Sequence, residues 1–167
     1  MTATRGSWTL DQAIVSRWAA AGLDAQFRDY WTDASYTQYP VLHDGDAIPA
    51  GAPGPYCVVQ KLTPVPIGHD SGKTSSTVNQ LQRCLVRFHV HAKTTTSLGL
   101  TGKAIAKALA MLVAAAYDWS YGTLSLSPDT HVMTTRMGDY PMHEEQDEWV
   151  WVLEYQITID CVYDQPT

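Results

Sequence analysis

The stretch WVWVLEYQITIDCVY, residues 149–163, decides the fold. Its odd-numbered positions carry apolar or aromatic side chains, whereas its even-numbered positions include Glu154, Gln156, Thr158 and Asp160. This period of two, in β-branched and aromatic residues, predicts one long β-strand with an apolar face and a polar face. Fifteen residues at ~3.3 Å each reach roughly 50 Å. We therefore expect this strand to bend, to carry a bulge or to meet another subunit.

Length and composition are those of a globular chain. The 167 residues predict a single α+β domain over residues 1–167. A hydrophobic content of 45%, with six Trp and nine Tyr, excludes global disorder. The net charge of −6 argues against a protein that binds nucleic acid tightly, because affinity for phosphate comes from clustered cations.

The sequence predicts a soluble, intracellular protein without a membrane partner. Its first residues contain no apolar signal core. The longest apolar helical run, residues 104–117, contains Lys107 and is too short to cross a bilayer. Cys57, Cys84 and Cys161 each lie in an apolar, strand-like context without a CxxC pair, which predicts buried thiols in a reducing compartment.

The first half of the chain predicts helix and then strands separated by long loops. Thr9, with Gln12 three residues later, predicts a helix start. Apolar residues at helical spacing then predict one broken helix or two consecutive helices up to residue 31. Residues 33–54 and 63–77 are rich in turn residues and predict long loops. Residues 55–62 and 82–92 alternate or run apolar and predict strands.

The second half predicts a helix followed by three strands. Residues 103–117 carry an apolar stripe typical of a helix packed on a sheet. Short strands are expected near 123–126 and 131–137, with a polar loop over 138–147 before the long final strand. The whole order predicts an α+β fold: a mostly antiparallel β-sheet with two main helices packed on one face, and long loops.

Two motifs invite a chemical interpretation. GHDSGKT, residues 68–74, has three residues between its first Gly and Gly-Lys where a phosphate-binding loop has four, and it does not open a helix. We interpret it as a flexible loop tip. His89 and His91 share one strand face, but zinc needs a third protein ligand, so exposed strand-face histidines are expected.

No pattern in the sequence marks a catalytic site. Glu144, Glu145, Asp147 and Glu148 form an acidic run that predicts a solvated, negative surface able to repel passing DNA. The chain lacks G-x-S-x-G, GxGxxG, HExxH and EF-hand motifs. We therefore predict no catalytic residue, no metal and no cofactor, and a protein that is not an enzyme. A small metal-dependent enzyme, the alternative, would depend on His89 with His91 and on residues 139–148.

Six residues are expected at a subunit or partner interface. Trp149 and Trp151 suit either the core or an interface, because aromatic side chains dominate both settings. Long loops are often functional, and they supply the four charged candidates, Asp70, Lys73, Asp139 and Glu144.

One ordered pattern spans nearly the full chain. It comprises an amphipathic helix with Ile14 and Trp18, a Pro40-Val41 piece, the strands containing residues 55–59 and 86–90, the helix after Gly102-Lys103, and the strand through Trp151, Tyr155, Ile157 and Ile159. This pattern resembles the tail terminator (tail completion or neck) proteins of long-tailed bacteriophages. The segment 23–39 is longer than the family has there.

The resemblance implies a small α+β subunit that assembles into a hexameric ring. In that family the ring stops tail-tube polymerisation and docks to a head-side connector or stopper protein, while genome DNA passes through its lumen without specific binding. The expected location is the virion tail or neck, with the host cytoplasm during assembly. A head–tail stopper or a tail-tube-like subunit is the nearest alternative. The family carries no catalytic residues.

Overall fold

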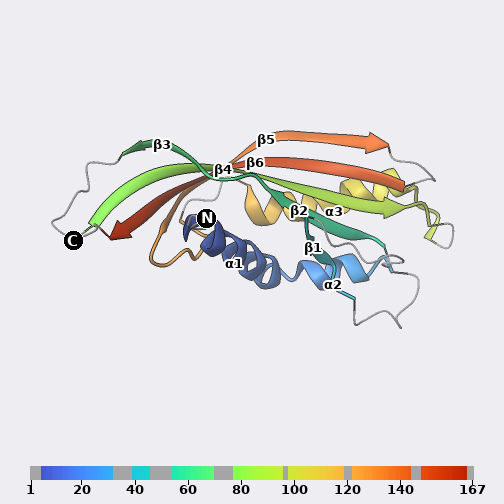
Figure 1. Ribbon diagram of the computed structural model, residues 1–167. Helices are drawn as coiled ribbons and strands as arrows, with labels where there is room; N and C mark the ends of the chain where they lie inside the picture. The colour runs from blue at the N-terminus through green and yellow to red at the C-terminus, as the bar shows by residue number, and fades with distance from the viewer. Residues whose placement is uncertain are drawn as a thin grey trace.

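The computed structural model describes residues 5–31, 39–45, 54–69, 77–95, 98–118, 122–143 and 148–164. Its elements are α1 (Arg5–Ala20), α2 (Leu23–Arg28), β1 (Leu42–Asp44), β2 (Tyr56–Lys61), β3 (Val65–His69), β4 (Thr77–Lys93), α3 (Gly102–Tyr117), β5 (Thr130–His143) and β6 (Glu148–Asp164). Figure 1 shows a long curved sheet with the helices beneath one face. The predicted α+β fold is confirmed: α1 and α3 are the two main helices, and β1 with β2 is the one parallel pair in a six-stranded sheet.

The antiparallel pair β4–β6 is the spine of the sheet. Both strands have 17 residues, and they pair without a break from Thr77↔Asp164 to Lys93↔Glu148. At ~3.3 Å per residue each strand extends about 56 Å. The long final strand expected from the sequence is therefore present, one residue longer at each end.

The strand order is β1-β2-β4-β6-β5, and β3 also pairs with β4. On the edge of β4 that faces away from β6, β2 pairs with the part from Val86 to His91, and β3 pairs with the part from Gln80 to Arg83. On the other side of the spine, β5 pairs with β6 through two register shifts, at His131/Met133 and Arg136/Gly138.

The core lies between the spine and the helices. Inward-facing residues of β6, from Trp151 through Tyr155 to Cys161, are buried, as are those of β4 from Cys84 to Ala92. The helices supply Leu10, Ile14, Trp18, Ile105, Leu109, Ala110 and Val113 to the same cluster. Gly102 allows α3 to start against β4, since a Cβ there would lie 2.7 Å from the Ala92 carbonyl oxygen.

A loop covers the part of the spine that the helices do not reach. Leu124 and Leu126 are buried in the core cluster that also contains Ile159 and Cys161. Asp129 fastens this loop, because its carboxylate accepts from the Val162 amide at 3.1 Å and from the Thr9 hydroxyl at 3.1 Å. The inner face of the over-long strand is thus buried within one chain from Trp151 to Cys161, whereas Trp149 and Tyr163 at its ends are half-buried.

Several sequence predictions are wrong, and edge strands explain most of them. The expected loop over 63–77 contains β3, while the strand expected near 131–137 and part of the loop expected over 138–147 form one strand, β5. Both strands carry a proline, Pro66 or Pro141, which edge strands tolerate because one side of their backbone needs no partner. Residues 123–126 are not a strand, and helix α1 begins at Arg5 rather than at Thr9.

The three cysteines are buried and free, as the sequence predicts. Burial raises the pKa of Cys84 to about 11, with the Asp11 carboxylate as a smaller cause. Across the described residues, none of the helices combines the length and the apolar character needed to cross a membrane.

We predict that Leu109→Ala lowers the free energy of unfolding by about 2–5 kcal/mol, because Leu109 is fully buried between α3 and the sheet. Met111→Ala is the matched control on the same helix. Met111 is 37% exposed, so its truncation should cost less than about 0.5 kcal/mol. Urea unfolding followed by circular dichroism measures both values, and equal losses for the two variants would contradict this packing.

Candidate interaction surface

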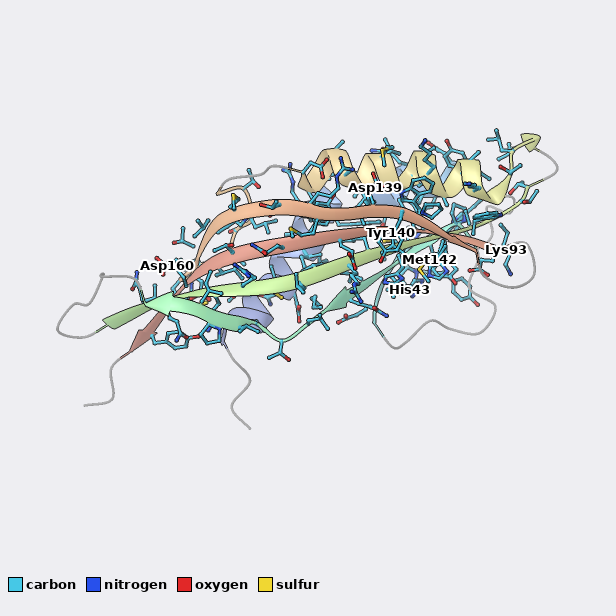
Figure 2. The ribbon with its side chains drawn as sticks, turned by 90° about the horizontal axis from the view of Figure 1, so that it is seen from above. His43, Lys93, Asp139, Tyr140, Met142 and Asp160 are labelled. Carbon is cyan, nitrogen blue, oxygen red and sulfur yellow. The ribbon has the colours of Figure 1, made fainter. Side chains whose placement is uncertain are left out.

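The face of the sheet opposite the helices carries two rows of mostly apolar and aromatic side chains. Figure 2 labels His43, Tyr140 and Met142 among them. Residues that pair across neighbouring strands share a face. The register therefore places His43, Val58, His89, Val152 and Tyr140 in one row, and Tyr56, His91, Val150 and Met142 in the next. We call these nine residues the outer strip. It crosses the sheet from β1 to β5.

The middle of the outer strip is buried although the helices all lie on the other face (Figure 1). Val58, Val150 and Val152 are at most 3% exposed, whereas Tyr140 and Met142, on the edge strand β5, are 39% and 44% exposed. Ion pairs flank the rows, with Arg87 and Glu154 on one side and Lys93 and Glu148 on the other. The centre of the strip is therefore already covered within the chain, and the apolar groups that another molecule could contact are those at the β5 end, Tyr140 and Met142.

One carboxylate, that of Glu148, orders the end of the outer strip. Its Oε1 accepts from the Tyr56 hydroxyl at 3.0 Å and lies 2.9 Å from His91 Nδ1. The Tyr56 and His91 rings stack with centroids 4.6 Å apart, and Lys93 Nζ lies 3.7 Å from the other carboxylate oxygen. Such charge-assisted contacts hold side chains in fixed positions.

A second carboxylate, that of Glu154, ties β4 to β5 at the other rim. Its Oε1 accepts from Arg87 Nε at 2.6 Å and from the Tyr140 hydroxyl at 3.3 Å. Gly138 leaves room for this carboxylate, because a Cβ there would come within 2.9 Å of Glu154 Oε2. The arrangement fixes the ring of Tyr140, an exposed aromatic residue, on the outer face.

The expectation of exposed histidines is wrong: His91 is 8% exposed and His89 is half-buried. Alternation places both on the outer face, but the neighbours that cover them come from other strands, which the local sequence does not show. Burial lowers the pKa of His43 and of His89, and the charge of nearby His91 lowers both further.

His131 is a buried histidine on the inner face. Its Nδ1 accepts from the amides of Thr123 and Leu124 at 3.1 and 3.3 Å, so Nε2 carries the proton and donates to Thr134 Oγ1 at 2.9 Å. Burial lowers its pKa. A proton on Nδ1 would break both contacts to the loop that covers the end of β6.

The expected interface residues separate into different environments. Trp151 is buried in the core, where its indole N–H donates to the Asp139 carboxylate, and Lys107 Nζ lies 5.6 Å from the centre of its ring. Trp149 is half-buried, and Lys103 Nζ lies 5.1 Å from the centre of its ring. Asp139 lies in strand β5 rather than in a loop. Asp70, Lys73 and Glu144 lie outside the described residues, and the interface role of all six stays a prediction.

Sequence reasoning missed two clusters of exposed apolar side chains at opposite edges of the sheet. The β3 patch consists of Leu62, Val65, Ile67 and Leu85, and the β5 patch consists of Met137, Tyr140 and Met142. Val65, Ile67, Tyr140 and Met142 lie in segments that the sequence assigned to loops, whereas Leu62, Leu85 and Met137 lie in predicted strands. The exposed apolar residues in those segments were the available signal.

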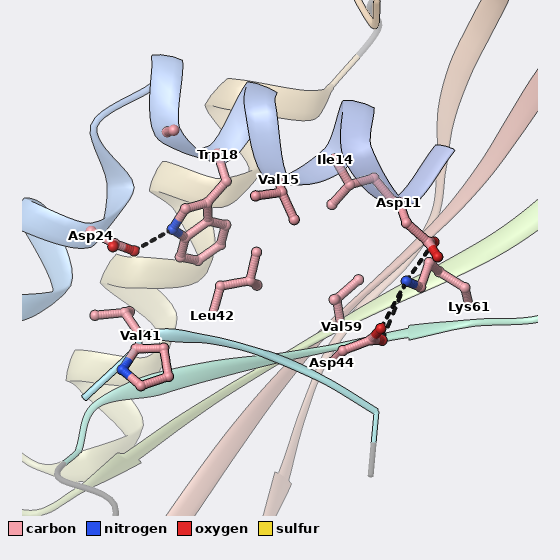
Figure 3. A pocket seen from close by; sticks show the side chains of 12 residues that line it. Asp11, Ile14, Val15, Trp18, Asp24, Val41, Leu42, Asp44, Val59 and Lys61 are labelled. Atoms are coloured by element: carbon pink, nitrogen blue, oxygen red, sulfur yellow. Dashed lines mark hydrogen bonds and ion pairs between the residues drawn. The ribbon is translucent and has the colours of Figure 1, made fainter. Parts of the chain in front are cut away.

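A groove lies between α1 and strands β1 and β2 (Figure 3). It encloses about 340 Å³ and is lined by Asp11, Ile14, Val15, Trp18, Ala19, Asp24, Pro40, Val41, Leu42, Asp44, Val59 and Lys61. At one end Lys61 Nζ bridges Asp11 at 2.5 Å and Asp44 at 3.3 Å. At the other end Trp18 Nε1 donates to Asp24 at 2.6 Å. Its lining offers apolar contact but no Ser, Cys or His nucleophile or base.

Within the described parts of the chain, no three or more His, Cys, Asp or Glu side chains are grouped so that they could hold a metal ion. The geometry that the described residues offer is that of contact surfaces: the outer strip, the two edge patches and the groove.

Comparisons with known proteins give no family. No family model matches the chain, and no curated protein matches it. A chain from the virion of a native gene transfer agent particle is similar in structure, with 18% identity and a TM-score of 0.45. The match covers 83% of this chain and 98% of that chain. At this identity and TM-score the likeness carries no argument about function.

We predict that the free energy of unfolding falls as the pH drops below about 6.5, the ordinary pKa of histidine. His43, His89 and His131 have lowered pKa values in the folded chain, so the unfolded chain takes up more protons in this window. Their contribution is fully present above pH 6.5 and is lost as the pH falls. Urea unfolding at pH 7.5, 6.5 and 5.5 measures the loss.

The double variant His43→Gln, His89→Gln is the control for this pH dependence. It should show a shallower fall than the wild type between pH 6.5 and 5.5, since two of the three groups are gone. Stability that rises on acidification, or an unchanged slope in the variant, would contradict the assignment.

Proposed function

We propose that this chain is a structural subunit of a phage-type virion that forms a ring at the head-proximal end of the tail. In this role the ring ends tail-tube polymerisation and joins the tail to a head-side connector or stopper protein. The resemblance in element order supports the role, since the fold contains the expected N-terminal helix, the central strand, the second helix and the long final strand in that sequence.

One observation carries the proposal: the sheet leaves apolar side chains exposed at edge strands. In the described sheet, β5 pairs only with β6, and β3 pairs only with β4. Exposed edges with apolar side chains mark sites where another chain adds. A monomer that keeps such edges at opposite sides of its sheet is suited to joining copies of itself.

Charge supports passage of DNA rather than binding to it. The chain has 17 acidic and 11 basic residues, which gives a net charge of −6. A negative protein surface repels phosphate, so DNA in the lumen of a ring built from such chains would move without being held. The role needs no catalytic residue, metal or cofactor, and it places the protein in the virion after assembly in the host cytoplasm.

We predict that the purified protein forms a species of about six times the 18.5-kDa chain mass, and that this species is ring-shaped in negative stain. Added to polymerising tail tubes, it should sit at one end of each tube and stop elongation. Analytical ultracentrifugation across concentrations gives the mass, and electron microscopy gives the tube lengths.

Three outcomes would contradict the role in different ways. A chain that stays monomeric alone and with tail tubes is not a ring subunit. Long cylinders from this protein alone would indicate a tail-tube-like subunit. Rings that bind a head-side connector but leave tube length unchanged would indicate a head–tail stopper.

A further inference from the structure

We infer that neighbouring copies in the ring meet head to tail, with the β5 patch of one copy against the β3 patch of the next. This inference rests on the proposed ring and names the surfaces that close it. A ring of more than two copies needs two different, complementary surfaces on each subunit, whereas a two-fold dimer needs only one that is complementary to itself.

The β3 patch is the first of these surfaces. Leu62, Val65, Ile67 and Leu85 are 50%, 58%, 43% and 39% exposed. The Leu62 amide donates to the Leu85 carbonyl at 2.9 Å, and Val65 pairs with Arg83, so the patch is continuous across the link between β2 and β3 and onto β4. Arg83 is exposed beside it and forms no ion pair with the described residues.

The β5 patch is the second surface. Met137 is 60% exposed at the register shift that precedes Gly138, and Tyr140 and Met142 follow on the outer face. On the inner face of β5, Asp118 and Asp139 share one guanidinium, that of Arg136, at 3.3 and 3.1 Å, and Lys107 lies near Trp151, to which Asp139 bonds. In the sequence Glu144, Glu145 and Asp147 come directly after β5.

The two patches are placed as a head-to-tail contact requires. The local strand order β3-β4-β6-β5 puts them on opposite edges of the sheet, three strand spacings or about 14 Å apart across the strands. Val65 lies at the level of Thr158 on β6, whereas Tyr140 lies at the level of Val152, so the patches are also offset by about 20 Å along the strands. The register places Val65 and Leu85 of one patch, and Tyr140 and Met142 of the other, on the same outer face, at edges on either side of the spine. Joining β5 of one copy to β3 of the next would therefore add subunits in one direction, so that the row of subunits can close into a ring.

Charge favours contact between unlike patches. The β3 patch against itself would bring two Arg83 guanidinium groups together, whereas the acidic sequence Glu144, Glu145 and Asp147 follows β5. Like charges at an interface are unfavourable, whereas Arg83 of one copy near Asp139 of the next is favourable.

Side chains rather than a long backbone ladder specify this contact. β3 carries a register shift between Pro66 and Gly68, and β5 carries two shifts and Pro141. Bulges and prolines interrupt edge-to-edge hydrogen bonding and are the devices by which edges avoid indiscriminate pairing. The exposed aliphatic and aromatic groups are then what selects the correct edge of the neighbour.

Two single variants test the inference. Val65→Glu places a carboxylate in the β3 patch, where it would meet the acidic β5 edge of the neighbour. Met137→Arg places a cation in the β5 patch, where it would meet Arg83. Each variant alone should sediment as an 18.5-kDa monomer under conditions in which the wild type forms rings. An equimolar mixture should form species that contain both variants, because one intact β5 patch and one intact β3 patch remain.

Val15→Glu is the control, since Val15 is 56% exposed on helix α1, which lies on the face of the sheet opposite both patches, and it should form rings as the wild type does. Rings from wild type, Val65→Glu and Met137→Arg alike would overturn the inference and leave the ring role intact. A wild type that forms no ring, with or without tail tubes, would overturn both.

A cross-linking measurement remains decisive if either charged variant fails to fold. Val65→Cys and Met137→Cys in one chain should give a ladder of covalent oligomers up to the ring when treated with a short bismaleimide. Within a chain the two sites are too far apart to be bridged by it, and the three natural cysteines are buried. No ladder from assembled rings would contradict the contact.

Discussion

The unbroken pairing of β4 with β6 is the constraint on which the structure depends. Seventeen consecutive pairs hold two strands of about 56 Å in one register. A slip of one residue would turn every buried side chain, from Trp151 to Cys161, to the opposite face. The alternation of the final strand therefore fixes both the position of the core and the orientation of all the other elements.

Different parts of the chain cover the inner face of this long strand pair. Helix α3 packs over one part of the inner face, and α1 and the loop that contains Leu124 and Leu126 add the rest. Asp129 joins the loop to β6 and to α1 through its two oxygens. The inner face of β6 is thereby buried within one chain from Trp151 to Cys161, and the exposed apolar patches of the sheet lie at its edges.

The sequence predicts the fold well where the signal is local. Alternation in β6, the alanine-rich stripe of α3 and the buried cysteines are each visible within a short window of residues. Strand β3 and the second half of β5 are missed because Pro66, Gly68 and Pro141 are typical of turns, yet an edge strand can contain them. Thr9 has the features of a helix cap, but its hydroxyl bonds to Asp129, which is 120 residues away in the sequence.

The interaction surface was less predictable because it is assembled from distant segments. His43, Val58, His89, Val152 and Tyr140 form one row only once five strands are placed side by side. The apolar residues Val150 and Val152 on the supposedly polar face of the final strand were the available hint. Of the six interface residues expected from sequence, Trp151 is buried in the core, which shows that aromatic content alone does not separate core from surface.

The most direct measurement is an electron cryo-microscopy map of the assembled protein at side-chain resolution. The account predicts a closed ring in which Met137, Tyr140 and Met142 of each copy contact Leu62, Val65 and Leu85 of the next, with Arg83 near the Asp139 carboxylate across the boundary. A ring in which both patches face solvent, or an assembly in which one patch meets its own copy across a two-fold axis, would contradict it.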